Sequence, residues 1–175
     1  MAFFIFLLYN KLGDYIKIIK EVIPYILIVI FVVLIRTYVV TPVIVSGESM
    51  HNTLNDGDIL LLKKYDKTYS RNDIVVFKYN DSKLVKRIIG LPGEYISYKD
   101  GKLYINETLY DDEFSNITAD FELVNLGYTK IPDGYYFVLG DNRTRSSDSR
   151  IIGLISKDDI EGTTSFSIWP FKSIK

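Results

Sequence analysis

The sequence predicts a mainly β protein, in which a single N-terminal transmembrane helix is followed by an all-β domain. An uncharged run of fourteen residues, Val22–Ile35, lies near the N-terminus. After Pro42, short segments rich in β-branched and aromatic residues replace the helical pattern. Turn signals built from Gly, Pro, Asn and Asp separate these segments. Many short strands joined by tight turns are typical of β-sandwiches and barrels.

The apolar run is the expected membrane anchor. Fourteen residues are fewer than the roughly 17–25 that cross a bilayer, but the apolar character continues past Arg36 to Val45. An arginine near a helix end can reach the headgroups while its stem stays in hydrocarbon. We expect Pro24 in the first turn, where its missing N–H costs little, and the helix to end before Pro42. The predicted segments are a cytoplasmic stretch at 1–21, an anchor at 22–40 and an all-β domain at 41–175.

A buried core helix and a cleaved secretory signal are the alternatives for this run. Asp14 and Glu21 precede it and no small-residue cleavage site follows it, which argues against a secretory signal. Lys11, Lys17 and Lys20 also precede it, so the positive-inside rule orients the N-terminus toward the cytoplasm. We therefore expect a single-pass protein of the cell membrane, in contact with the lipid bilayer, whose β domain is extracellular.

The predicted strands begin after the anchor, and a short helix is predicted near the C-terminus. The strands are Val43–Ser46, Asp58–Lys63, Asp73–Lys78, Leu84–Ile89, Tyr95–Tyr98, Leu103–Ile105, Tyr135–Leu139 and Thr164–Ile168, and the helix is Ser156–Ile160. The stretch from about 95 to 130 is less hydrophobic and contains Asp111, Asp112 and Glu113. We interpret it as a surface insertion between core strands.

Composition excludes several classes of function. The chain has no cysteine and a single histidine, so it lacks the residues for disulfides and for an ordinary zinc site. The first 40 residues carry four basic and two acidic side chains, whereas the rest carries 17 basic and 20 acidic ones. A mildly acidic domain has no electrostatic footprint for nucleic acid. We expect no metal, no cofactor and no nucleic-acid partner.

The candidate catalytic groups are a serine and a lysine. A serine nucleophile needs a base, and His51 is an awkward one for Ser49, which stands two residues before it. The G-x-S-x-G elbow is absent, as is S-x-x-K with its K-T-G companion. A lysine can serve as the base if burial lowers its pKa, and Lys86 lies among apolar residues of a predicted strand. Taken alone, these residues leave a solvated lysine and a turn serine open.

Three blocks carry a family resemblance. Ser46–Leu54 (SGESMHNTL), Leu84–Glu94 (LVKRIIGLPGE) and Leu139–Arg150 (LGDNRTRSSDSR) closely resemble the signature boxes of type I signal peptidases, in order and spacing. Asp56–Ile59 and Asn72–Val75 resemble the remaining box. The resemblance covers nearly the whole chain from the apolar run onward. It implies a signal-peptidase-type β domain and a serine endopeptidase that removes signal peptides from exported preproteins at the outer surface of the cytoplasmic membrane.

The resemblance also implies roles for individual residues. Ser49 would be the nucleophile, its backbone N–H a donor to the oxyanion, and Lys86 the neutral general base. Ser146 would hydrogen-bond the lysine amine and fix its direction. Met50 would keep the amine dry, and Gly47 stands where some relatives have a second oxyanion donor.

The remaining implied roles concern substrate binding and support. Val45 and Val85 would line apolar pockets that accept small residues of the signal peptide. Ion pairs would brace the site, formed by Asp141 and Asp148 with Arg87 and Arg150.

One position departs from the family pattern. Asn52 replaces a proline of the first box, which leaves the substrate preference open. The alternatives are a specialised peptidase and a non-catalytic relative that assists assembly of pilus or other surface proteins. A soluble self-cleaving repressor-type protease also uses a serine and a lysine, but the predicted membrane span argues against that class.

Overall fold

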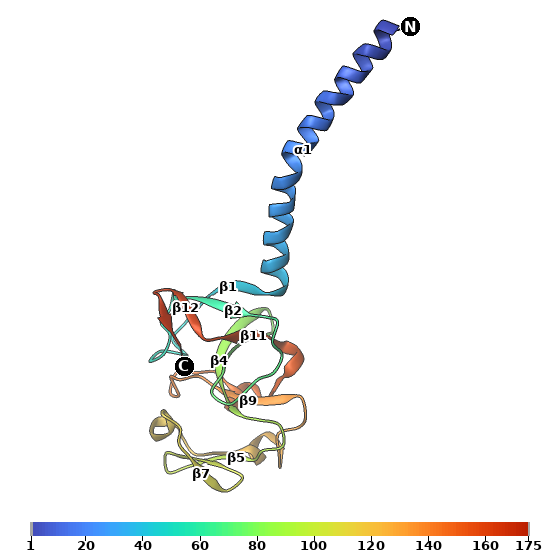
Figure 1. Ribbon diagram of the computed structural model, residues 1–175. Helices are drawn as coiled ribbons and strands as arrows, with labels where there is room; N and C mark the ends of the chain where they lie inside the picture. Colours follow the sequence, from blue (N-terminus) through green and yellow to red (C-terminus); the bar gives the residue numbers. More distant parts are fainter. Residues whose placement is uncertain (1, 175) are drawn as a thin grey trace. The chain divides into compact units, whose positions relative to one another are not determined.

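The structure, a computed structural model, describes residues 2–174, and it describes their side chains except those of residues 2–14 and 116. A long apolar N-terminal helix is followed by a β domain, which confirms the predicted fold class (Figure 1). The chain divides into two compact units at Val39 and Val40. Each unit is described below by itself.

The N-terminal helix α1 runs from Ala2 to Tyr38. Its segment Tyr15–Tyr38 has 24 residues, enough for about 36 Å of helix, which exceeds the hydrocarbon thickness of a bilayer. The helix begins before the predicted anchor, so Pro24 lies inside it, and the prediction that this proline occupies the first turn is wrong. No glycine or second proline interrupts the residues between 14 and 23, and a lone proline removes only one backbone donor.

The β domain contains a large antiparallel sheet of nine strands within the described residues. The strands are β1 (Val40–Ile44), β2 (Ile59–Lys63), β3 (Ile74–Tyr79), β4 (Ser82–Gly90), β9 (Tyr135–Leu139), β10 (Ile155–Ser156), β11 (Ile160–Thr164), β12 (Phe166–Trp169) and β13 (Lys172–Ser173). Their order is β10-β9-β4-β3-β11-β2-β12-β13, and β1 pairs with β2. The short helices of the β domain are α2 (Ser149–Ile152), η1 (Ser115–Ile117), η2 (Leu123–Leu126) and η3 (Lys157–Asp159).

Both faces of the central strand β3 are covered. Ile74 and Val76 belong to one apolar cluster, while Val75 and Phe77 belong to another, because successive side chains of a strand point to opposite faces. All four are buried, which explains why this strand is continuously hydrophobic instead of alternating. The neighbouring strand β4 is buried from residue 85 to residue 90 for the same reason.

A second sheet lies within the region interpreted as an insertion. Its four strands are β5 (Ile96–Lys99), β6 (Lys102–Ile105), β7 (Thr108–Tyr110) and β8 (Phe121–Glu122), in the order β7-β6-β5-β8. Figure 1 shows this small sheet on the side of β9, away from β12. Its apolar residues share a cluster with Ile89, Phe137 and Leu139 of the large sheet. A Cβ at Gly90 would overlap Ile131, Ile96 and Phe137, so this glycine permits the close contact.

Two predicted elements near the C-terminus are different in the structure. The helix expected at Ser156–Ile160 is a single 3-10 turn, η3, in which the Asp158 N–H donates to the Ser156 side chain. The single strand expected at Thr164–Ile168 is divided between β11 and β12. The division has a physical cause, because β11 lies between β3 and β2 whereas β12 lies between β2 and β13.

The contact between the sheets provides a test of this packing. Phe137 is fully buried and belongs to the cluster that joins them, so Phe137→Ala should lower the free energy of unfolding by about 3–5 kcal/mol. Tyr135 in the same strand is 40% exposed, and Tyr135→Ala should change it by only about 0.5 kcal/mol. Urea unfolding of the detergent-solubilised chain, followed by circular dichroism, measures both. Equal effects of the two variants would contradict the described core.

Candidate active site

A loop between β1 and β2 carries Ser49. The His51 N–H donates to the Glu48 carbonyl at 3.0 Å, and the Leu54 N–H donates to the Met50 carbonyl at 2.8 Å, so the segment forms consecutive turns. Met50 and Leu54 are buried in an apolar cluster, whereas Ser49 is only half-buried. Two apolar side chains thus anchor the loop on either side of a serine that stays accessible.

Lys86 lies on β4 and is only 2% exposed. Its Nζ lies 2.7 Å from the Ser49 Oγ and donates to the Val85 carbonyl oxygen at 3.1 Å. Burial lowers the pKa of this lysine from 10.5 to about 8, although the negative charges of Asp148 and Asp141 partly oppose the effect. With this pKa, about a tenth of the amine is neutral at pH 7. Composition alone allows Lys86 to be solvated, whereas the structure shows that it is buried.

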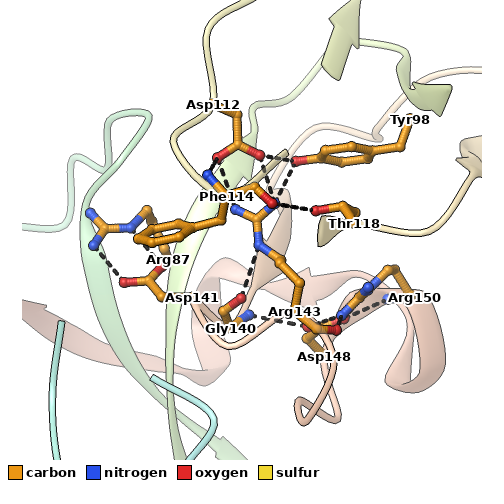
Figure 2. Close-up of polar contacts among 10 residues, drawn as sticks. All are labelled: Arg87, Tyr98, Asp112, Phe114, Thr118, Gly140, Asp141, Arg143, Asp148 and Arg150. Atoms are coloured by element: carbon orange, nitrogen blue, oxygen red, sulfur yellow. Dashed lines mark hydrogen bonds and ion pairs between the residues drawn. The ribbon is translucent and has the colours of Figure 1, made fainter. Parts of the chain in front are cut away.

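Two buried carboxylates near this lysine are each paired with an arginine. Arg87 donates to Asp141 through Nε at 2.8 Å and Nη2 at 2.7 Å. Arg150 donates to Asp148 through Nε at 2.8 Å and Nη2 at 2.9 Å. Both carboxylates are fully buried, and both pairs are drawn in Figure 2. The guanidinium groups limit the field of the carboxylates at Lys86, which would otherwise favour its charged form.

The Ser146 hydroxyl is buried and has no hydrogen-bond partner in the described part of the chain. The hydrogen bond that the resemblance implies between this hydroxyl and Lys86 is therefore not formed. Ser146 instead packs against Gly140, where an added Cβ would overlap the Ser146 Oγ and the Ser49 carbonyl oxygen. The lack of a side chain at Gly140 thus lets its backbone lie against both the Ser49 loop and Ser146.

The other residues implied by the resemblance surround this centre. Val45, Met50 and Val85 are buried together in one apolar cluster next to the serine and the lysine. Gly47 has a positive φ of 91°, and its N–H donates to the Asp56 Oδ1 at 2.7 Å. Asn52 has a φ of 104°, which the ring of a proline does not allow.

Sequence analysis missed Gly140 and Arg143. Arg143 is 3% exposed, and it donates to Asp112 of the small-sheet region and to the Gly140 carbonyl (Figure 2). An arginine in a polar stretch is normally solvated, so composition offers no signal for its burial. Gly140 directly follows the predicted strand Tyr135–Leu139, and a glycine at a strand end can mark close backbone approach.

No group of three or more metal-ligating side chains lies among the described residues. The arrangement that these residues do form is a hydroxyl next to a buried amine with a lowered pKa. Such a pair can exchange a proton, and proton transfer to a neighbouring base is one way in which a hydroxyl is activated for nucleophilic attack.

Comparison with known proteins identifies the family. Residues 16–169 match the family model described as signal peptidase, peptidase S26. Signal peptidase I S of Bacillus subtilis is 38% identical over 84% of this chain and 86% of its own length. Signal peptidase I of Bacillus licheniformis is 37% identical over 95% of this chain and 93% of its own length.

A solved structure agrees with the sequence matches. A signal peptidase I from Enterococcus faecalis superimposes with a TM-score of 0.52 and 38% sequence identity, covering 55% of this chain and 96% of that one. Since the family model matches most of the residues and the relatives extend over nearly the whole chain, this chain belongs to the S26 family of signal peptidases.

Proposed function

We propose that this chain, a signal peptidase I, is a serine endopeptidase in which Ser49 is the nucleophile and Lys86 the general base. One observation carries the proposal: the Lys86 Nζ lies 2.7 Å from the Ser49 Oγ, and the lysine is only 2% exposed. The contact places the hydroxyl within reach of the amine for proton transfer. Burial brings the pKa of the amine to about 8, close to neutral pH, where a general base is most effective. The relatives named signal peptidase I support signal peptides of exported preproteins as the substrates.

The first half of the reaction forms an acyl-enzyme. The neutral amine of Lys86 accepts the Ser49 proton while the Oγ attacks the carbonyl carbon of the scissile peptide bond. The oxyanion accepts a hydrogen bond from the Ser49 backbone N–H, which is bonded to no other group in the described part of the chain. The ammonium of Lys86 then gives its proton to the leaving nitrogen, and the C–N bond breaks.

The second half releases the signal peptide. Lys86, neutral again, accepts a proton from a water molecule while the water oxygen attacks the ester carbon on Ser49. The tetrahedral intermediate collapses, the ester C–O bond breaks, and Lys86 returns the proton to the Ser49 Oγ. Both halves use the same amine alternately as base and acid, so its pKa must lie near the working pH.

Val45 and Val85 are our candidates for the walls of the substrate pockets. They share an apolar cluster with Met50, the residue next to the nucleophile. Apolar walls of this kind accept the small apolar side chains of a signal peptide without burying an unpaired polar group. The serine and the lysine are both present and in contact, so no observation favours a non-catalytic relative.

We propose further that the chain crosses the cell membrane once, with its β domain outside. The segment Tyr15–Tyr38, with its uncharged part Val22–Ile35, supports a single span, and the lysines at 11, 17 and 20, which precede that uncharged part, support a cytoplasmic N-terminus. The proposed organisation is a cytoplasmic segment at 1–21, an anchor at 22–40 and a peptidase domain at 41–175. Ser49 follows the apolar part of the sequence, which continues to Val45, by only a few residues, and this suits a substrate whose hydrophobic part is still in the lipid.

Removing either member of the pair tests the assignment. Ser49→Ala and Lys86→Ala should each lower the rate of preprotein cleavage by roughly 10³-fold or more, because the two residues act as one unit. His51→Ala is the control, since His51 is exposed, and its cleavage rate should stay close to that of the unchanged chain. Cleavage after an Ala-x-Ala sequence by the detergent-solubilised chain is the measurement. Full activity of purified Lys86→Ala would end the proposal.

The pH dependence of cleavage should follow the lysine. Only the neutral amine accepts the Ser49 proton, so kcat/KM should rise about tenfold per pH unit below pH 8 and level off above it. Initial rates from pH 6 to pH 10, at substrate concentrations well below KM, give the midpoint. A midpoint near the ordinary lysine pKa would mean that the amine is hydrated in the working enzyme.

The same pKa shift predicts a change in stability with pH. The folded-state pKa of Lys86 lies below its unfolded value of 10.5, so protonating the buried amine costs free energy, and stability is lost as the pH falls from 10.5 toward 8. Lys86→Met keeps the apolar stem without the charge. The stability of Lys86→Met relative to the unchanged chain should therefore increase by about 3 kcal/mol as the pH falls through this range. Thermal unfolding of both chains at a series of pH values measures it, and a constant difference would contradict the prediction.

The absence of cysteine allows a direct test of topology. A thiol introduced by Lys130→Cys, at an exposed position of the β domain, should react on intact cells with a maleimide that does not cross membranes. A thiol introduced by Lys11→Cys should react only after the cells are opened. The opposite labelling pattern would reverse the proposed orientation.

A further inference from the structure

A buried polar cluster links the small sheet to the segment that carries Ser146. We call it the Arg143 cluster, and its members are Arg143, Tyr98, Asp112 and Thr118 (Figure 2). Arg143 donates to both Asp112 oxygens, at 2.6 and 2.9 Å. It also donates to the Tyr98 hydroxyl at 3.1 Å and to the Thr118 Oγ1 at 2.9 Å. The three acceptors all come from the region between 95 and 130, so this arginine is the only member from outside it.

The other side of Arg143 holds the backbone of Gly140. Its Nε donates to the Gly140 carbonyl at 3.0 Å, and the Gly140 N–H donates to Asp148 at 3.1 Å. Arg150, which is paired with Asp148, also donates to the Arg143 carbonyl at 2.7 Å. Both polar groups of Gly140 are therefore occupied by members of one connected network, which fixes the orientation of this residue.

Gly140 in turn touches the groups of the active site. A Cβ there would overlap the Ser146 Oγ and the Ser49 carbonyl oxygen, so the backbone lies directly against both. The Asn142 N–H donates to the same Ser49 carbonyl at 3.0 Å. A displacement of Gly140 would consequently be transmitted to the nucleophile loop and to the side chain that packs behind it.

The charges of the cluster make it sensitive to the loss of one member. The Arg143 side chain is fully buried, and that of Asp112 is 7% exposed. Burial alone raises the pKa of the Asp112 carboxyl, but the hydrogen bonds and charge of Arg143 outweigh it and hold the pKa below its usual value. Asp112 is thus ionised at neutral pH, and removing its charge would leave a buried guanidinium without a counterion.

We propose that Asp112 is a positioning residue for catalysis: through Arg143 it holds Gly140, and through Gly140 it sets the positions of Ser146 and the Ser49 loop. This inference rests on the proposed function of the serine and lysine. Asp112 touches no reacting atom. The small sheet thereby supplies a carboxylate on which the geometry of the active site depends.

Attachment of the small sheet does not by itself need this ion pair. Apolar residues of β5, β6 and β8 already pack with Ile89, Phe137 and Leu139 of the large sheet. A buried ion pair contributes little net stability because desolvation offsets its attraction, although removing one partner is costly. What the pair adds is direction, since a guanidinium that binds a carboxylate with two parallel bonds has one orientation.

The test compares Asp112→Asn with Asp111→Asn. Asp112→Asn keeps the shape and removes the charge, so kcat should fall about tenfold or more while KM changes little. The midpoint of the kcat/KM profile should also move to higher pH, because a displaced Gly140 and Ser146 admit water beside Lys86. Asp111 is the adjacent, exposed carboxylate, and Asp111→Asn should leave kcat and the midpoint unchanged. Unchanged kcat and midpoint in Asp112→Asn would overturn the proposal.

A second pair of variants separates positioning from stability. Leu103 is buried in the small sheet outside the Arg143 cluster, so Leu103→Ala should lower the unfolding temperature and leave kcat and the midpoint unchanged well below that temperature. If Leu103→Ala reproduces the kinetic changes of Asp112→Asn, the effect is one of stability and the proposal fails. Thr118→Val removes one acceptor of Arg143 and decides the matter should Asp112→Asn not fold. A shift of the Thr118→Val midpoint to higher pH, smaller than the shift expected for Asp112→Asn, supports the proposal. An unshifted midpoint overturns it.

These outcomes are distinct from failure of the proposed function. An active Lys86→Ala chain would remove the serine–lysine assignment whatever Asp112 does. An inactive Lys86→Ala chain together with a fully active Asp112→Asn chain would leave the assignment intact and remove only the positioning role.

Discussion

The constraint on which the structure depends is the burial of one amine beside one hydroxyl. Lys86 is almost completely withdrawn from solvent, and its Nζ lies 2.7 Å from the Ser49 Oγ. Burying an ammonium is unfavourable, so the surrounding packing has to compensate for it. The strand that carries Lys86 lies between β3 and β9, and its residues Val85, Ile88 and Ile89 belong to three apolar clusters. This packing leaves the lysine 2% exposed, and the burial lowers its pKa.

The charges around the amine are arranged to limit their own effect. Asp141 and Asp148 favour the protonated lysine, yet each is neutralised by a two-bond pair with an arginine. Strand β4 supplies both Lys86 and its neighbour Arg87. A single element therefore positions the proposed base and the arginine that pairs with Asp141. The carboxylates remain useful to the fold because they accept hydrogen bonds from Thr53 and from the Gly140 backbone. The result is a polar network in which each buried carboxylate has its own arginine, while burial lowers the pKa of the lysine.

The small sheet changes the interpretation of the region between 95 and 130. Its composition indicated a surface excursion, but several of its apolar residues, among them Ile96, Leu103 and Phe121, are buried in the cluster shared with the large sheet. The acidic run at 111–113 likewise contains two exposed carboxylates and one, Asp112, that is turned toward a buried arginine. Average composition hides such a division, because one carboxylate among three carries the contact while the other two are solvated.

Local pattern was sufficient for the apolar helix, for most strands and for the turns, because hydrophobic periodicity and turn chemistry are properties of neighbouring residues. Family resemblance supplied Ser49 and Lys86 as a pair, but their contact joins positions 37 residues apart, and only the tertiary structure decides whether that lysine is buried. The same holds for the burial of Arg143, for the Ser146 hydroxyl, which has no partner among the residues described, and for the division of β11 from β12. Burial, pairing and strand partners are set by segments distant in the chain, so no window of sequence contains the groups that determine them.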